Sequence, residues 1–283
     1  MAHATSKPVA LSIAGFDPSA GAGVLADLKT FAAHECYGVA AIAAMTAQNT
    51  REVRKVAPIE TSLLRLQIEV LFEDIDIAGI KIGLLGSRKN LESVAECLAQ
   101  HKNLPVVIDP VFRSSSGTDF ISNGELDLFK RLLFPLALVL TPNAEEAGRL
   151  LGIPVATLDD MKGAAKLLHE QGVKHVVITG GHLEKPADVY YEGQEVEVFA
   201  GNRIESQSTH GTGCTFSSAI LANLLNGKAV KESVVLAKAY VTQAIAHAYP
   251  IGNGRGPLNH LFRSGESPAR AGGPEVLYEG PHR

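Results

Sequence analysis

The sequence predicts an α/β fold with a mostly parallel central sheet, helices on both faces and a small antiparallel hairpin. Short apolar runs alternate with stretches of helical periodicity over about 180 residues, a pattern typical of doubly wound sheets. Two alternating runs around a glycine turn, 187–191 and 196–199, indicate the hairpin. Polar or glycine residues follow the ends of the apolar runs, where open parallel sheets bind ligands. These residues are Gly15, Gln48, Gly83, Asp109, Asn143 and Gly180.

The individual elements follow from the spacing of apolar residues. The run 9–14 is short and continuously apolar, which predicts a buried strand, whereas Val24, Leu28 and Phe31 recur at helical spacing. By the same reasoning, strands are expected at 39–45, 77–82, 105–108, 136–140 and 175–178. Helices are expected at 59–72, 91–100, from 145 onward, and at 161–170, 216–225 and 230–248.

Composition limits the classes of protein that this chain can belong to. Its 283 residues carry a net charge of −4 and no basic stripe, which argues against a nucleic-acid partner. No apolar run is long enough to span a bilayer, and the first eight residues lack the apolar core of a signal peptide. Three scattered cysteines indicate a reducing compartment, so we expect a cytoplasmic protein. We expect one domain over 9–262 and a flexible tail over 263–283.

The stretch 208–216 combines a glycine turn with the start of an apolar helix. Gly211, Thr212 and Gly213 would then lie at a helix N-terminus, where free backbone N–H groups and the helix dipole favour an anion such as a phosphoryl group. Cys214 would lie in the same positive field, which predicts a lowered thiol pKa. Two other interpretations remain open: a glycine turn that binds nothing, and a cysteine that is only a small buried side chain.

A second glycine-rich loop, 15–23, joins the first strand to the first helix. It has neither the Gly-Lys-Ser/Thr ending of a Walker A loop nor a clean dinucleotide fingerprint. Because the carboxyl ends of parallel strands share one edge, we expect this loop and the other polar strand ends to line one crevice that faces the 211–214 helix start.

These motifs, taken in order, resemble the hydroxymethylpyrimidine/phosphomethylpyrimidine kinases of thiamine biosynthesis, which belong to the ribokinase-like superfamily. The resemblance covers about residues 9 to 260, nearly all of the predicted domain. The motifs that carry it are AGFDPSAGAG at 14–23, ADLKT at 26–30, AQNT at 47–50, KIG at 81–83, DPV at 109–111, TPN at 141–143, GGHL at 180–183, THGTGCT at 209–215 and GRGPLNH at 254–260.

The resemblance implies ATP and Mg²⁺ as co-substrate and metal, an aminopyrimidine substrate, and a role for each matching position. A homodimer is common in the superfamily, although the sequence leaves the oligomeric state open. The implied substrate ligands are Gly15, Asp27 and Gln48; the implied anion hole is Gly211, Thr212 and Gly213, with Cys214 as the base; Asn143, Thr179, Gly180, Gly181 and Thr209 would follow the ATP phosphates; and Asp109 and Glu146 would act around Mg²⁺.

Two departures from the family pattern leave alternatives open. Many members have lysine where this chain has Thr179, and Lys-Ser-Gly where it has 115–117, Ser-Ser-Gly. Two cations that face phosphate are therefore expected to be missing, with Arg113 and Lys81 as candidates to compensate, and the second phosphorylation is in doubt. The alternatives are a pyridoxal or pyridoxine kinase and a non-catalytic pyrimidine sensor; a cysteine hydrolase is disfavoured because no His/Asn pattern accompanies Cys214.

Overall fold

The computed structural model describes residues 7–113, 120, 123–181 and 183–265, which share one central sheet. Its strands are β1 Val9–Phe16, β2 Tyr37–Gln48, β3 Val53–Pro58, β4 Ile77–Ile82, β5 Val106–Ile108, β6 Val139–Leu140, β7 His175–Gly180, β8 Ala187–Tyr191 and β9 Glu197–Ala200. Within the described residues they form a nine-stranded sheet in the order β3-β2-β1-β4-β5-β6-β7-β8-β9.

Strand direction confirms the mostly parallel sheet that the sequence predicts. The neighbouring pairs from β2 through β1, β4, β5 and β6 to β7 are parallel, whereas β3, β8 and β9 are antiparallel to their neighbours. The predicted hairpin is β8–β9. The carboxyl ends of β1, β2, β4, β5, β6 and β7 therefore meet at one edge of the sheet.

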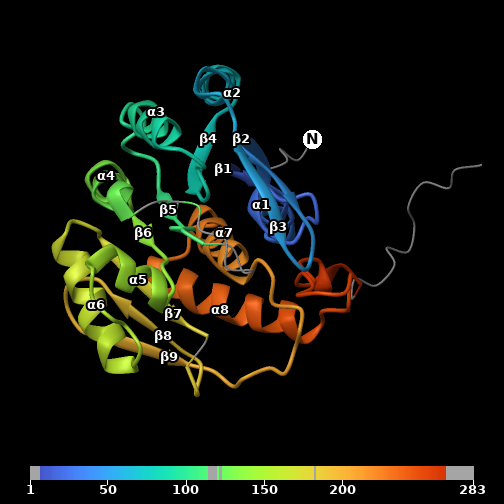
Figure 1. Cartoon of the computed structure of the whole chain (residues 1–283), viewed down its shortest axis with the longest axis vertical. Coiled ribbons are helices and arrows are strands. Elements are labelled where there is room, and N and C mark those ends of the chain that lie inside the picture. Colours follow the sequence, from blue (N-terminus) through green and yellow to red (C-terminus); the bar gives the residue numbers. More distant parts are fainter. Residues whose placement is uncertain (1–6, 114–119, 121–122, 182, 266–283) are drawn as a thin grey trace, which may run out of the picture.

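The helices cover both faces of the sheet (Figure 1). They are α1 Gly23–Ala33, α2 Thr61–Asp74, α3 Arg88–Leu98, α4 Asn123–Leu133, α5 Ala144–Leu151, α6 Leu158–Glu170, α7 Thr212–Leu225 and α8 Val230–Ala246, with short 3-10 helices η1 Phe134–Leu136 and η2 Phe262–Gly265. Helices α1, α7 and α8 pack on one face, and α2 to α6 on the other. No helix in the described part of the chain is both long and apolar enough to cross a membrane.

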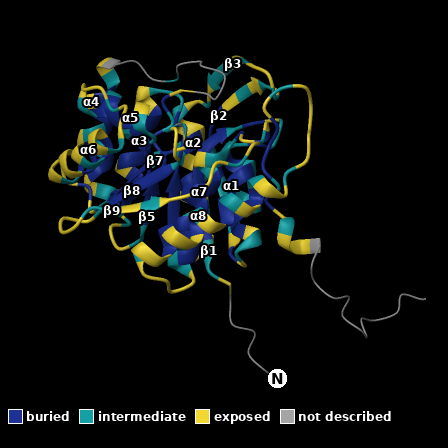
Figure 2. Cartoon of the chain, turned by 90° about the horizontal axis from the view of Figure 1, so that it is seen from below, coloured by how far each residue is buried: buried dark blue, intermediate teal, exposed yellow. Residues whose placement is uncertain are grey.

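Two apolar clusters, one on each face, hold these layers together. Successive side chains of a strand point to opposite faces, so Leu11 and Ile13 of β1 join the cluster under α2–α6, while Ala10 joins the cluster under α7 and α8. Phe216 and Ile220 on α7 belong to this second cluster. Figure 2 shows the buried strands enclosed by helices whose outer surfaces are exposed. The core thereby fixes α7, and with it the glycine turn, against the sheet.

Three elements differ from the prediction. The expected strand 136–140 is shorter, because 134–136 form the 3-10 helix η1, which contains Pro135. Strand β3 was not predicted, since an exposed edge strand with Arg54 and Lys55 lacks an apolar run. Helix α4 was not predicted either. Of the expected flexible tail, residues 266–283 lie outside the described residues, so the tail and the domain bounds remain predictions.

Candidate active site

The glycine turn lies at the start of α7, as the sequence predicts. Gly211 is the N-cap residue of this helix and has a φ of 82°, in the left-handed region that favours glycine. A Cβ at Gly211 would lie 1.8 Å from the carbonyl oxygen of Gly21, so the turn is pressed directly against the 15–23 loop. The exposed Thr209 contributes through its carbonyl oxygen, which accepts a 2.7 Å hydrogen bond from Thr212 Oγ1.

The next residues of α7 face the end of β5. Gly213 is exposed, and a Cβ there would lie 3.7 and 3.8 Å from the two carboxylate oxygens of Asp109. Asp109 is itself buried, and among the described residues none donates a hydrogen bond to its Oδ2 atom. Cys214 is half-buried beside this carboxylate, and the backbone N–H of Gly23 points toward its sulfur. An exposed glycine, a thiol and a carboxylate thus come together here.

A fully buried ion pair lies beneath Cys214. Lys81 Nζ is 3.0 Å from both carboxylate oxygens of Asp27 and 3.9 Å from Asp109 Oδ2. Ser12 Oγ and Ser218 Oγ also donate to Asp27, at 2.6 and 2.8 Å. The side chains of Asp27 and Lys81 have no exposed surface. Asp27 therefore lies below the site, and the contact with substrate that the resemblance implies would require its present partners to move.

The same burial corrects two expectations about charge. Lys81 cannot compensate for a missing phosphate-facing lysine, because its ammonium is enclosed by carboxylates. The prediction of a lowered thiol pKa is wrong for this structure. Burial raises the pKa of Cys214, and the carboxylates of Asp109 and Asp27 raise it further, whereas Lys81 acts in the opposite direction. The other candidate cation, Arg113, is exposed and pairs with Glu145 at 2.9 Å; residues 115–117 lie outside the described part of the chain.

Two neighbouring carboxyl groups are the candidate metal ligands. Burial raises the pKa of Asp109, although Lys81 opposes this effect, and burial together with the Asp109 charge raises the pKa of Glu146 well above its ordinary value. Glu146 also closes a capping box at the start of α5: its Oε2 accepts from the Asn143 N–H at 2.8 Å, and its own N–H donates to Asn143 Oδ1 at 2.9 Å. Two close carboxyl groups with raised pKa values are what a divalent cation would stabilise in their charged forms.

The 15–23 loop is organised around a single carboxylate. Asp17 accepts from the backbone N–H groups of Ser19, Gly21 and Ala22 at 2.9 to 3.2 Å, and from His210 Nε2 at 2.7 Å. Burial alone would raise the pKa of Asp17, but the hydrogen bonds from His210 and Ser19 lower it below its ordinary value.

Two predicted substrate residues border this loop. The Gln48 carboxamide lies 3.0 Å from His210 Nε2. At the end of β1, Gly15 leaves room for Leu84, since a Cβ at Gly15 would lie 3.0 Å from Leu84 Cδ2.

The predicted ATP residues lie further along the same edge of the sheet. Asn143 pairs with Thr179 in an isolated parallel bridge. Gly180 is the last residue of β7, and Gly181 lies in the turn that follows. The Gly180 N–H donates to Asp188 Oδ1 at 3.2 Å, and Asp188 Oδ2 forms a 2.6 Å ion pair with Lys238 of α8. Asp188 and Lys238 were not predicted from the sequence. An acidic residue within the apolar strand β8 was the available signal.

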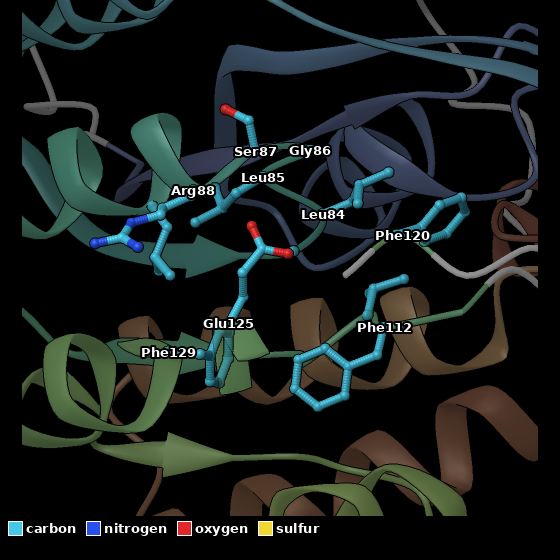
Figure 3. Close-up of a pocket in the computed structure, with 12 residues that line it drawn as sticks. Leu84, Leu85, Gly86, Ser87, Arg88, Phe112, Phe120, Glu125 and Phe129 are labelled. Carbon is cyan, nitrogen blue, oxygen red and sulfur yellow. The ribbon is translucent and has the colours of Figure 1, made fainter. Parts of the chain in front are cut away.

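A narrow cavity lies beside the site, between the turn after β4 and helix α4 (Figure 3). Leu84, Leu85, Phe112 and Phe129 line it, and Glu125 extends toward the turn that carries the two leucines. Its volume of about 30 Å³ accommodates one or two water molecules but no vitamin-sized ring. We therefore do not assign the substrate to this cavity.

Comparison with known proteins agrees with the fold and with the family resemblance. The family model described as phosphomethylpyrimidine kinase matches residues 17–259. A hydroxymethylpyrimidine/phosphomethylpyrimidine kinase of Aquifex aeolicus is 40% identical over 87% of this chain and 97% of its own. A thiamine biosynthesis bifunctional protein, ThiED, of Geobacter sulfurreducens is 39% identical over 89% of this chain, which spans only 52% of that protein.

Solved structures extend the comparison. An ADP complex of Bacillus subtilis pyridoxal kinase has a TM-score of 0.83 and 38% identity, covering 90% of this chain and 98% of its own. A phosphomethylpyrimidine kinase of Clostridium difficile has a TM-score of 0.75 and 37% identity, covering 84% and 100%. Together the fold and the site define a ribokinase-like kinase of a small molecule. The chain belongs to the phosphomethylpyrimidine kinase family.

Proposed function

We propose that this kinase transfers the γ-phosphoryl group of ATP to 4-amino-5-hydroxymethyl-2-methylpyrimidine and then to the resulting monophosphate, in thiamine biosynthesis. The observation that carries the proposal is the arrangement of Gly213 and Cys214, at the start of α7, against the Asp109 carboxylate at the end of β5. The names of the curated relatives support the aminopyrimidine substrate. The ADP and AMP-PCP complexes of the structural relatives support ATP.

The chemistry requires positioning and charge stabilisation more than covalent machinery. The backbone N–H groups at the 211–213 turn would bind the transferring phosphoryl group, because that end of α7 has no side-chain cap. Cys214 would take the proton of the substrate hydroxymethyl group as its oxygen attacks phosphorus. Since burial raises the pKa of the thiol, Cys214 holds its own proton in the free protein and must first pass it on. The half-buried thiol can release this proton to water, while the Asp109 carboxylate beside it stays ionised for the metal ion.

Asp109 and Glu146 fit a magnesium ion. Mg²⁺ uses one or two carboxylates, with water and substrate phosphates completing its shell. The Asp109 Oδ2 atom lacks a hydrogen-bond donor among the described residues, and the pKa of each carboxyl group is raised. No cluster of three or more acidic, histidine or cysteine ligands occurs in the described part of the chain, so the proposed protein ligands are these two carboxyl groups. When bound, the ion would neutralise charge on the β- and γ-phosphates.

A coupled ADP-release assay tests the proposal. The purified protein is supplied with ATP, Mg²⁺ and either hydroxymethylpyrimidine or its monophosphate, and the products are identified by mass spectrometry. We expect turnover with both, at a lower rate for the monophosphate because lysine is absent at Thr179 and Ser115. ADP release that does not depend on either pyrimidine would contradict the proposal, as would pyrimidine binding without turnover, the behaviour of a sensor.

Pyridoxal phosphorylation is the second candidate function. Solved pyridoxal kinases of Bacillus subtilis and Staphylococcus aureus have TM-scores of 0.83 and 0.84 with this chain, above the value of 0.75 for the Clostridium difficile enzyme. Parallel assays with pyridoxal, at equal concentration, measure the ratio of the two kcat/KM values. A homodimer and a cytoplasmic location remain predictions.

A further inference from the structure

His210 connects three parts of the site that are distant in sequence. Its side chain is 6% exposed and lies between the 15–23 loop and Gln48. A Cβ at Gly21 would lie 2.3 Å from His210 Cδ2, so the imidazole ring occupies the space over this glycine. The ring position is therefore fixed by packing as well as by hydrogen bonds.

Asp17 determines whether His210 Nε2 carries a proton. The distance from Asp17 Oδ2 to His210 Nε2 is 2.7 Å, and the Asp17 side chain is 4% exposed. Because hydrogen bonds to Asp17 hold its pKa below the ordinary value, its carboxylate is ionised and can only accept. His210 Nε2 must then carry a proton and donate it to Asp17. The Gln48 carboxamide, 3.0 Å from the same nitrogen, cannot donate to it, but a carboxamide oxygen there can share its single N–H with Asp17 in a three-centre hydrogen bond.

This result decides the orientation of the Gln48 carboxamide. Its Nε2 atom is 3.0 Å from His210 Nε2, which would set one N–H donor against another. Its Oε1 atom is 3.4 Å from Thr46 Oγ1, but the single hydroxyl proton of Thr46 is used in a shorter, 3.0 Å bond to the Phe16 carbonyl. Both neighbours therefore favour the reversed amide, with oxygen toward His210 and nitrogen toward Thr46. Oxygen and nitrogen of a carboxamide are assigned from such neighbours.

We propose that His210, held by Asp17, is a positioning and specificity-determining residue that turns the Gln48 carboxamide so that it pairs with an aminopyrimidine. In this orientation one N–H of the Gln48 carboxamide is left to donate to a ligand, and one lone pair of its oxygen is left to accept from it. An aminopyrimidine has the complementary pair, a ring nitrogen acceptor next to an amino donor, whereas pyridoxal has no ring amino group. This inference rests on the proposed function and concerns how Gln48 selects the ring.

Steady-state kinetics of a double-mutant cycle on His210 and Gln48 test the role of His210 in turnover. His210→Phe keeps a flat ring over Gly21 but removes the donor, so we expect the KM for hydroxymethylpyrimidine to rise about 10-fold or more, with little change in the KM for ATP. The ratio of kcat/KM for hydroxymethylpyrimidine to kcat/KM for pyridoxal should fall. His210→Gln, which restores an N–H donor, should recover most of the lost affinity. In a Gln48→Ala background, His210→Phe should raise the pyrimidine KM no further, because its effect passes through Gln48.

The controls separate this role from a structural one. His101→Phe alters a histidine that stacks on Phe72 before β5, at the opposite edge of the sheet, and should leave every kinetic constant unchanged. A fully additive cycle would overturn the inference, as would equal rises in the KM values for pyrimidine and ATP.

A measurement on the free protein separates the inference from the proposed function, and it does not require His210 variants to fold. In ¹⁵N-labelled wild-type protein, a two-bond ¹H–¹⁵N spectrum should show a protonated His210 Nε2, and the Gln48 side-chain NH₂ should give NOEs to the Thr46 methyl group. An unprotonated Nε2, or NOEs from this NH₂ to the His210 ring alone, would refute the inference even if the enzyme phosphorylates pyrimidines. Absence of pyrimidine turnover by the wild type would refute only the proposed function.

Discussion

Replacing Gly213 by alanine should separate catalysis from folding. A Cβ at this position meets nothing closer than the Asp109 oxygens at 3.7 and 3.8 Å, which is ordinary van der Waals contact, and no left-handed φ has to be maintained. Gly213 lies within α7, where alanine is the better helix former by up to about 1 kcal/mol. In the proposed mechanism, however, the added methyl group occupies the approach of the phosphoryl group to the backbone. Losing one preorganised donor costs about 100-fold in kcat, or roughly 2.7 kcal/mol.

The expected result is thus a protein of equal or higher stability with at least ~100-fold lower kcat. Urea unfolding followed by circular dichroism measures the first quantity, and coupled ADP release measures the second. Gly163→Ala is the matched control: this exposed glycine lies within α6 with no atom within 4 Å of the added Cβ, so its stability gain should come without loss of activity. Near-normal kcat in Gly213→Ala would refute the reasoning and leave the turn with a structural role only.

Three further perturbations test the charges around this turn. Cys214→Ser should lower kcat by about 10²–10⁴-fold if the thiol is the base. Because burial raises the pKa of this thiol, its rate of labelling by iodoacetamide in the free wild type should keep rising above pH ~8.5. A labelling rate that reaches a plateau near neutral pH would contradict the raised pKa. Lys81→Met leaves Asp27 without its ammonium partner and should lower the free energy of unfolding in urea by about 3–5 kcal/mol, with partial recovery in Lys81→Met/Asp27→Asn. A loss below ~1 kcal/mol would show that the ion pair contributes little to stability. Asp17→Asn should lower the free energy of unfolding by about 1–3 kcal/mol at pH 7. Because the pKa of Asp17 is lowered in the folded protein, the difference in stability from wild type should shrink as the pH falls below about 4. A difference that is constant with pH would be evidence against the ionised contact with His210.

The main architecture could be predicted because it depends on local periodicity. The continuous apolar runs of β1 and β4 and the helical spacing in α1 and α8 each carry their own signal. The polar strand ends could be grouped because parallel strands share an edge. Strand β3 gave no such signal, since it is an exposed edge strand that pairs antiparallel to β2 and carries charged side chains. The position of β3 is determined by its pairing with β2 and not by a pattern of apolar residues of its own.

The charges of the site could not be predicted from the same information. The glycine turn and the helix start at 211–214 follow from sequence, but the pKa of Cys214 depends on burial and on Asp109 and Asp27, which are about 100 and 190 residues away in the chain. One signal was available. Lys81 interrupts an apolar strand between Ile80 and Ile82, and a lysine there must have a buried partner or leave the core. The sequence did not say that this partner is Asp27.

The contacts of the glycines explain why the site depends on the whole fold. Gly211 approaches the Gly21 carbonyl, Gly21 lies under His210, and a Cβ at Gly23 would lie 2.1 Å from the Gly15 carbonyl. Two segments about 190 residues apart therefore meet backbone to backbone, with no room for a side chain between them. Neither segment can adopt its site conformation alone, because each provides the surface that holds the other. The proposed phosphoryl site is consequently assembled only when α7 has packed against the sheet, so the positions of Gly213 and Cys214 are properties of the completed fold and not of the motif.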